Sequence, residues 1–329
     1  VDNHALIYAQ GLANQRNVPL KVVFNLVPKF LDATLRSFHF MLKGLEEVEK
    51  NLRDLGIPFY LLKGDPTVTV PGFIQDHDAA AIVCDFASVR VPIMWTSSVA
   101  TTMNQRNVPM IQIDAHNVVP CFHASPKLEY SARTIRSKIN ALLPQFLNDD
   151  MPALAPNATQ AAALHGVEKV DWAGALKSLE IDRSVKEVDW LQPGTAAAWE
   201  MYRTFCDTRL SLYAAKRNDP NLHVCSDMSP YFKFGQFSVQ RAILHIKSLR
   251  KSPESTASYV EEALVRRELS DNFCFYNPNY DNLNGIYPWA RESLNLHKAD
   301  TRSPLYTKDQ FERAETYDDL WNAAQFQMV

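Results

Sequence analysis

Short apolar runs alternate with helical patterns over the first 120 residues, and this alternation constrains the fold more than any other feature. The runs are rich in β-branched and aromatic residues, which favours strands. They cover residues 20–26, 59–62, 80–86 and 110–114. A helical pattern lies between the first two runs, over residues 38–55, and stops at Gly56 before Pro58. The order strand, helix, strand predicts a doubly wound parallel sheet covered by helices, of the Rossmann-like kind.

Helical patterns alone fill the last part of the chain. They cover residues 195–213, 230–250, 255–273, 289–299 and 308 onward, with proline-containing loops between them. The stretch between Pro144 and Gln192 is rich in Pro, Ala and Asp and contains no strand-like run. We therefore expect an α/β domain over residues 1–120, an interdomain linker over 121–194 and an all-α domain over 195–329.

The composition is that of a folded protein in a reducing compartment. With 329 residues, of which 46% are hydrophobic, the chain can bury two domain cores. The five cysteines are scattered and form no C-x-x-C pair, which argues against a disulfide framework or a zinc site. There is no uninterrupted apolar run of about 18 residues and no secretory signal pattern. We expect an intracellular, soluble protein with no membrane segment.

Charge and catalytic motifs exclude several classes of function. The net charge of −3 does not favour nucleic-acid binding, so any such role must rest on local clusters of Lys and Arg. Such clusters occur at residues 216–217, 241–251 and 266–267, and each taken alone is typical of a solvated helix face. The chain has no nucleophile elbow, P-loop or H-E-x-x-H motif, and His116 and His123 lack companion ligands. Hydrolase chemistry and a metal site therefore have no support.

One segment, residues 213–236, carries more chemistry than the rest. It contains Tyr213, then Ser226-Asp227-Met228-Ser229, then Pro230 and an aromatic run. Ser, Asp and Pro in this order predict the first turn of a helix, where hydroxyl groups and free backbone N–H groups converge and could bind a phosphate or pyrophosphate. We place Gln236 two turns into that helix, facing the same point. A Ser-x-x-Ser-Pro segment can equally be a simple helix cap.

Glu262 precedes Arg266 by four residues on the next predicted helix. This spacing predicts an ion pair between the Glu262 carboxylate and a guanidinium one turn later. A surface ion pair is the simplest interpretation of this pattern.

Several motifs together resemble one family, the photolyases and cryptochromes, and within it the class II cyclobutane pyrimidine dimer photolyases. They are Y-A-x-x-R-N-D-P at 213–220, S-x-x-S-P-Y-x-x-F-G-Q at 226–236, V-R-R-E-L-S-D-N-F-C at 265–274, W-A-R at 289–291 and D-L-W-N-A-A-Q at 319–325. Further matching segments lie at 2–6 and 127–134, so the resemblance covers essentially the whole chain. It implies a photolyase-like α/β domain followed by a helical FAD-binding domain.

The resemblance also implies cofactors, substrate and site residues. It implies FAD as the catalyst, a possible second antenna chromophore of the folate or deazaflavin type, and UV-damaged DNA containing pyrimidine dimers as the substrate. The implied FAD contacts are Tyr213, Ser226, Asp227, Met228, Ser229, Gln236 and Arg267. The implied DNA or lesion contacts are Arg217, Asn218 and Arg266. Arg266 is a departure, because many relatives have a Trp that stacks on the lesion at this position.

Two residues are implied to act in the chemistry itself. Glu262 resembles the glutamate that hydrogen-bonds the thymine carbonyls, and Trp321 resembles the middle member of a Trp relay that photoreduces FAD. Such enzymes continue past the position that matches residue 329, and both ends of this sequence look cut, so we expect an incomplete helical domain. The expectation is a monomeric repair enzyme, in the nucleus of a eukaryote or the cytoplasm of a prokaryote. The alternatives are a cryptochrome-like photoreceptor without repair activity and an inactive fragment.

Overall fold

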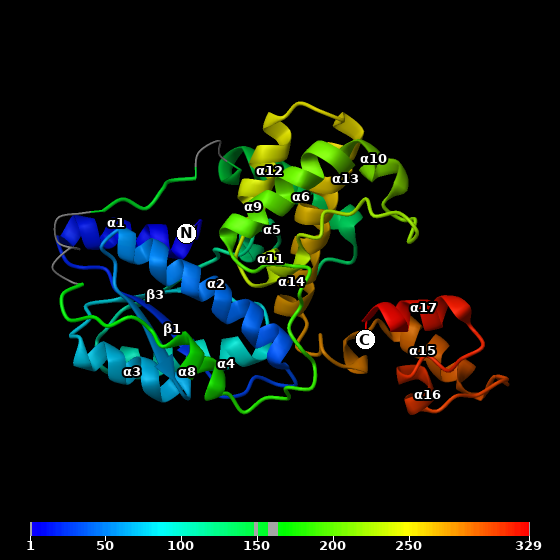
Figure 1. Ribbon diagram of the computed structural model, residues 1–329, viewed down its shortest axis with the longest axis horizontal. Coiled ribbons are helices and arrows are strands. Elements are labelled where there is room, and N and C mark those ends of the chain that lie inside the picture. Colours follow the sequence, from blue (N-terminus) through cyan, green and yellow to red (C-terminus); the bar gives the residue numbers. More distant parts are fainter. Residues whose placement is uncertain (1, 148–150, 157–163, 329) are drawn as a thin grey trace. The chain divides into compact units, whose positions relative to one another are not determined.

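The structure, a computed structural model, describes residues 2–147, 151–156 and 164–328. The chain divides into two compact units, residues 1–278 and residues 279–329, which we describe one at a time. Within the first unit, an α/β part is followed by a helical part (Figure 1). The predicted fold class, α/β followed by all-α, is confirmed.

The α/β part contains strands at all four predicted positions. Its elements are α1 His4–Arg16, β1 Val22–Leu26, α2 Leu35–Asp54, β2 Phe59–Lys63, α3 Pro66–Asp76, β3 Ile82–Asp85, α4 Arg90–Gln105 and β4 Met110–Ile113. Both strand pairs in the described residues are parallel, with Val22 opposite Phe59 and Ile82 opposite Met110. The strands hydrogen-bond as two separate pairs, β1 with β2 and β3 with β4.

Alternation along the strands places a helical layer on each face. Val22 and Phe24 of β1 pack with Phe59 of β2 in a cluster that includes α1 and α2. The intervening Val23 packs with Ile82 in a second cluster that contains Phe73, Ile74, Val99 and Met103 of α3 and α4. In a strand, successive side chains point to opposite faces, so this two-residue period produces the layers visible in Figure 1.

The helical part is built from short helices interrupted by two π-helical segments. Its elements are α9 Thr195–Thr204, η1 Phe205–Arg209, α10 Leu210–Lys216, α11 Ser229–Lys233, α12 Val239–Ser248, α13 Pro253–Val260, η2 Glu261–Arg266 and α14 Arg267–Tyr276. The single helix expected over residues 230–250 is wrong. Gly235 has φ +65°, a left-handed conformation that ends α11 and lets the chain turn before α12 begins.

The predicted linker, residues 121–194, contains helices α5 Cys121–Ala124, α6 Ala132–Phe146 and α8 Trp172–Lys177. Ile135 and Ile139 of α6 pack with α12 and η2 in the helical part. Ala175 of α8 instead packs against α2 in the α/β part. No strand occurs among the residues of this range that the structure describes, and residues 148–150 and 157–163 lie outside them. The domain boundaries stay predictions.

Gln236 ties the helical part to α2. Its side-chain Oε1 accepts a hydrogen bond from the Gly194 N–H at 2.6 Å, and its Nε2 donates to the Phe40 carbonyl at 2.8 Å. The amide sits against the backbone of Gly44, where an added Cβ atom would lie 2.3 Å from Nε2. Gln236 follows the turn at Gly235 and lies outside any helix, so its predicted position two turns into a helix is wrong.

One face of α14 binds the chain that follows β4. Glu268 Oε1 accepts hydrogen bonds from the N–H groups of Val118 at 2.6 Å and Val119 at 3.2 Å. Asn272 accepts from the Glu129 N–H at 2.7 Å and donates to a neighbouring carbonyl, and Tyr276 donates to the Ser125 carbonyl at 2.7 Å. Because Glu268, Asn272 and Tyr276 are spaced at i, i+4, i+8, they lie on one side of the helix.

The second unit contains η3 Leu283–Gly285, α15 Pro288–Leu296, η4 His297–Ala299, α16 Lys308–Glu312 and α17 Asp319–Met328. Among its described residues only Ala314 is buried. Its large apolar side chains are mostly exposed, namely Leu283, Trp289, Leu294, Leu296, Leu305, Phe311, Tyr317, Leu320, Trp321, Phe326 and Met328. These residues therefore provide little hydrophobic core of their own.

The contact between Gly44 and Gln236 can be tested by adding one methyl group. Gly44→Ala should lower the free energy of unfolding by about 1–3 kcal/mol, because the new Cβ displaces a buried, hydrogen-bonded amide. Gly11→Ala is the matched control, since Gly11 also lies inside a helix but has no neighbour within 4 Å of an added Cβ. The control should gain about 0.5–1 kcal/mol. Equal effects of the two changes in urea unfolding would contradict the assigned role of Gln236.

Glu268 makes stability depend on pH. Burial raises its pKa from 4.5 to about 8, against the opposing effects of Arg267 and of the Val118 and Val119 N–H groups. The folded state therefore binds more protons than the unfolded state between these values, and stability should fall as pH rises through that window. Glu268→Gln should remove about 2–4 kcal/mol of this fall. Urea unfolding of the unchanged chain and of the variant at about pH 5 and about pH 8.5 measures this fall in stability. Parallel pH profiles for the two proteins would contradict the assignment of the fall to Glu268.

Candidate functional site

Four of the predicted site residues lie around the junction of α10, α13 and η2. Tyr213 lies in α10, Arg217 and Asn218 follow that helix, and Glu262 lies in η2. Ser255 of α13 holds α10 in place, because its Oγ accepts a hydrogen bond from the Ala214 N–H at 3.0 Å. The helices thus bring together residues that lie about 45 positions apart in the sequence.

Arg217 connects Tyr213 with Glu262. Its Nη1 lies 2.9 Å from Glu262 Oε1, and its guanidinium carbon lies 5.8 Å from the centroid of the Tyr213 ring. Both charged side chains are about one-third exposed, whereas Tyr213 is buried, and burial raises the pKa of its hydroxyl. The three side chains place a guanidinium, a carboxylate and a phenol hydroxyl together at one corner.

The turn at residues 226–229 combines a left-handed residue with a right-handed one. Asp227 adopts the left-handed conformation, with φ +59°, and Met228 follows in the right-handed region. Such a pair turns successive N–H groups toward one point. The Met228 N–H donates to Ser226 Oγ at 3.4 Å, while Ser229 begins α11 and is exposed. The alternative prediction, that Ser226 to Ser229 form a simple side-chain cap, is wrong. Met228 occupies the N-cap position, and no side chain caps α11.

The Asp227 carboxylate is already paired. Its Oδ2 accepts a hydrogen bond from Arg209 Nη1 at 2.8 Å and lies 2.8 Å from His223 Nε2. The Arg209 side chain is only 12% exposed, and its Nε is buried without a hydrogen-bond partner in the described part of the chain. Sequence reasoning missed Arg209, although it precedes Tyr213 by four residues and could have been placed on the same helical face.

Tyr259 is a second residue that sequence reasoning missed. It is 3% exposed, and its ring centroid lies 5.8 Å from that of Tyr213. Within the described residues its hydroxyl makes no hydrogen bond of good geometry, although Ser226 and Tyr202 lie close enough to affect its pKa, which burial raises strongly. The position of Tyr259, one turn before Glu262, is the only signal in the sequence.

The predicted ion pair between Glu262 and Arg266 is wrong. Arg266 Nε binds Glu261 Oε1 at 3.3 Å, and Arg136 of α6 binds the same carboxylate through two hydrogen bonds of 2.9 and 2.6 Å. The cause is the π-helical segment η2, in which residues five apart are in register, so Arg266 meets Glu261. Glu262 is left to face Arg217.

Arg267 points toward the chain after β4. Its Nη1 donates to Asn117 Oδ1 at 3.1 Å, its Nη2 donates to the His116 carbonyl, and it lies 3.8 Å from Asp271. None of these partners belongs to the group around Tyr213. A contact between Arg267 and a flavin stays a prediction.

Trp321 belongs to the second unit. Its side chain is 47% exposed, and its ring packs edge-on against Phe311 with 5.1 Å between centroids. Its relay role stays a prediction, as do the roles of the exposed Asn218 and Arg266 in DNA binding.

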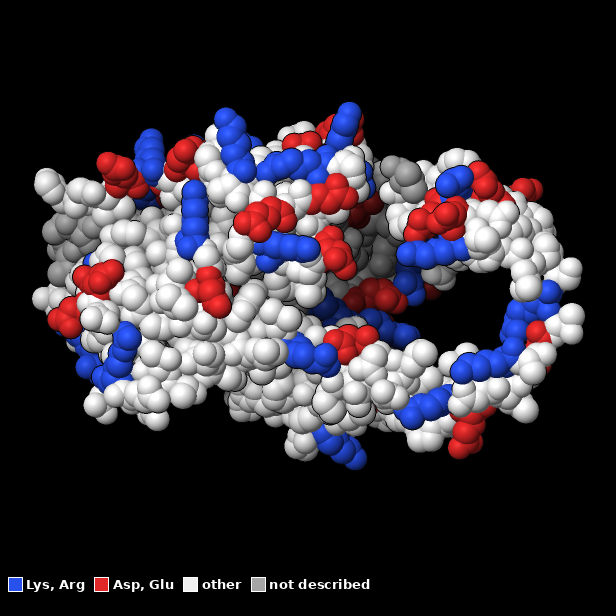
Figure 2. Space-filling view, turned by 90° about the horizontal axis from the view of Figure 1, so that it is seen from below, with Lys and Arg blue, Asp and Glu red and all other residues white. Residues whose placement is uncertain are grey.

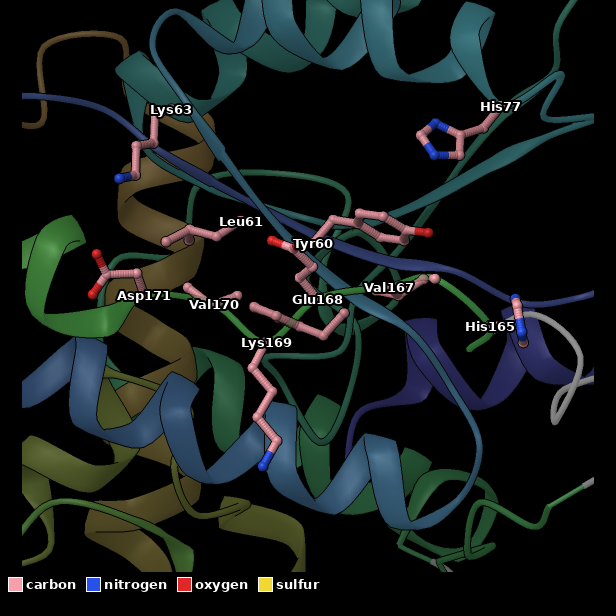
Figure 3. A pocket seen from close by; sticks show the side chains of 12 residues that line it. Tyr60, Leu61, Lys63, His77, His165, Val167, Glu168, Lys169, Val170 and Asp171 are labelled. Carbon is pink, nitrogen blue, oxygen red and sulfur yellow. The ribbon is translucent and has the colours of Figure 1, made fainter.

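A cleft of about 510 Å³ lies elsewhere, between β2 and residues 165–171 (Figure 3). Glu49 of α2 holds the far wall by accepting hydrogen bonds from the Val170 N–H and the Trp172 indole. Figure 3 shows the ammonium groups of Lys63 and Lys169 pointing away from Tyr60. The lining residues carry both signs of charge and include none of the predicted site residues: Phe59, Tyr60, Leu61, Lys63, His77, His165, Gly166, Val167, Glu168, Lys169, Val170 and Asp171.

Surface charge, metal ligands and long apolar helices indicate no further site in the described part of the chain. Over the face seen in Figure 2, basic and acidic side chains are intermingled. No group of three or more His, Cys, Asp or Glu in the described ranges could hold a metal ion. None of the described helices is both long and apolar enough to cross a membrane.

Comparison with solved structures identifies the fold. A class III photolyase from Agrobacterium tumefaciens matches with a TM-score of 0.70 at 16% identity, over 99% of this chain and 66% of that one. A cryptochrome from Synechocystis matches with a TM-score of 0.70 at 14% identity, over 98% of this chain and 67% of that one. At these identities the similarity concerns the fold alone.

Sequence comparison identifies the family. Residues 1–157 match the family model described as DNA photolyase. The chain is 49% identical to a deoxyribodipyrimidine photo-lyase of Potorous tridactylus over 330 aligned residues, which cover all of this chain and 61% of the relative's length. It is 43% identical to the Arabidopsis thaliana protein of the same name, of which it covers 67%, and 33% identical to that of Methanothermobacter thermautotrophicus, of which it covers 70%. This chain belongs to the DNA photolyase family.

Proposed function

We propose that this chain carries the core of a light-driven enzyme that repairs cyclobutane pyrimidine dimers in UV-damaged DNA, with FAD as its cofactor. The observation that carries the proposal is the grouping of Tyr213, Arg217 and Glu262 at one corner, beside the turn at residues 226–229. The relatives with 33–49% identity, each named deoxyribodipyrimidine photo-lyase, support it.

The residues at this corner suit the diphosphate end of FAD. The turn offers backbone N–H groups, Ser226 and Tyr213 offer hydroxyls, and the buried Tyr259 hydroxyl lacks a good hydrogen-bond partner. Arg209 pairs with the Asp227 carboxylate, so the one negative charge of the turn is balanced. Such a donor set favours an anionic group over a neutral one.

When bound, FAD supplies the light-excited electron that splits the dimer. Glu262 is placed to bind a pyrimidine carbonyl, because its carboxylate is partly exposed at the edge of the corner. Arg217 and Asn218 begin a polar, largely exposed loop, and their donors can bind bases left unpaired when a dimer leaves the duplex. Arg217 can therefore bind either the Glu262 carboxylate or the nucleic acid.

The proposal extends to the oligomeric state, the compartment and a second chromophore. We propose a monomer that works where DNA is found, in the nucleus of a eukaryote or the cytoplasm of a prokaryote. A second chromophore of the folate or deazaflavin type is part of the same proposal, and the cleft between β2 and residues 165–171 is large enough for a small planar molecule.

The proposal is tested by the absorbance spectrum of the purified chain and by a repair assay on UV-irradiated oligothymidine with and without blue light. Flavin bands together with light-dependent loss of dimers are the expected result. Flavin without repair would favour a cryptochrome-like photoreceptor. Absence of flavin would refute cofactor binding by this chain.

Glu262 is expected to act on the dimer rather than on the cofactor. Glu262→Ala should lower the repair yield per absorbed photon by about tenfold, with little change in flavin content. Glu254→Ala is the matched control, because Glu254 lies exposed on the adjoining helix α13. Quantum yields that are equal in the two variants would remove Glu262 from the mechanism.

A further inference from the structure

The turn at residues 226–229 contains its own negative charge. Asp227 contributes a carboxylate within the segment that the proposed function assigns to a diphosphate. The Asp227 carboxylate and a phosphate group bound in the same turn would repel each other, and this repulsion is stronger in a partly buried site than in water. A turn that binds a phosphate group therefore needs a cation that compensates Asp227.

Arg209 is that cation. Its Nη1 donates to Asp227 Oδ2 at 2.8 Å, and both side chains are largely buried, with 12% and 19% of their surface exposed. The guanidinium carbon also lies 5.8 Å from the centroid of the Phe205 ring, and Nη2 lies 3.7 Å from Met201 Sδ. His223 Nε2 also lies 2.8 Å from Asp227, but His223 is 75% exposed. The permanent and better-buried partner of Asp227 is Arg209.

The pairing also shapes the backbone. A left-handed conformation is uncommon outside glycine, and Asp and Asn are among the residues that tolerate it best. At φ +59°, Asp227 has its carboxylate directed to Arg209 in η1 while its peptide unit leads into Met228 and α11. Arg209 thus fixes the residue whose conformation turns the N–H groups of this segment toward one point.

Two buried polar atoms next to the turn provide an independent indication of a ligand. Within the described residues Arg209 Nε has no hydrogen-bond partner, and the Tyr259 hydroxyl makes no hydrogen bond of good geometry, although Ser226 and Tyr202 lie close to it. Tyr259 is 97% buried, and polar atoms buried in this way normally have a partner. A diphosphate in the turn would offer acceptor oxygens to such donors.

We propose that Arg209 is a positioning residue that makes the turn at 226–229 accept the diphosphate of FAD, by neutralising Asp227 and holding it in its left-handed conformation. This inference rests on the proposed function and assigns Asp227 a supporting role in place of direct contact with the cofactor. Its effect is specific to ligands that carry phosphate groups.

The test compares the Kd of FAD with the Kd of riboflavin, which lacks the diphosphate, by quenching of flavin fluorescence. Arg209→Gln leaves Asp227 uncompensated, so the Kd of FAD should rise at least about tenfold while that of riboflavin stays within about twofold. The double variant Arg209→Gln/Asp227→Asn removes both charges and should recover most of the FAD affinity. Arg203→Gln, at an exposed arginine on the preceding helix, is the matched control and should change neither Kd.

Asp227→Asn alone provides a test that does not depend on the folding of the Arg209 variant. Asn also tolerates the left-handed conformation, and Arg209 is then free to face the diphosphate, so FAD should bind at least as tightly as to the unchanged chain. Weaker FAD binding in Asp227→Asn, equal weakening of FAD and riboflavin in Arg209→Gln, or no recovery in the double variant would each overturn the inference. If the unchanged chain binds riboflavin but gains nothing from the diphosphate of FAD, the inference fails while flavin binding stands. If it binds neither ligand, the proposed cofactor fails as well.

Discussion

The helical run from Pro253 to Tyr276 is the element on which the arrangement of the first unit depends. Its last part, α14, supplies acceptors and donors to the backbone that follows β4, through Glu268, Asn272 and Tyr276. Buried backbone groups need hydrogen-bond partners. The segment after β4 obtains them from these side chains. Its first part carries Tyr259 and, in η2, Glu262. One helical run therefore joins the α/β part to the candidate site.

The π-helical segment within this run decides which charges meet. A regular α-helix would place Glu262 beneath Arg266. In the wider turn Arg266 instead binds Glu261, which Arg136 also binds. Glu262 therefore pairs with Arg217. The result is a carboxylate that is anchored through its neighbour yet still partly exposed.

Much of the fold could be predicted from local patterns. The four strands, α2 and the helical character of the last part follow from hydrophobic periodicity, which reports how one face of an element is buried. The break between α11 and α12 was missed, because the aromatic and apolar pattern continues through Gly235 and hides the left-handed turn there. The contacts of Gln236 with Phe40 and Gly194 could not be predicted from local patterns either, because they join segments up to 196 positions apart.

The sequence by itself determined the fold class, the family and the chemical types of residue available at the site, because periodicity and local motifs are properties of neighbouring residues. It identified Tyr213, Arg217 and Glu262 as candidates but paired Glu262 with the wrong arginine. Only the tertiary structure decided that Arg217 meets Glu262, that Arg209 compensates Asp227 and that Tyr259 lies buried beside Tyr213. Such contacts depend on how separate helices pack and on a π-helical turn, and neither can be read from the spacing of residues along the chain.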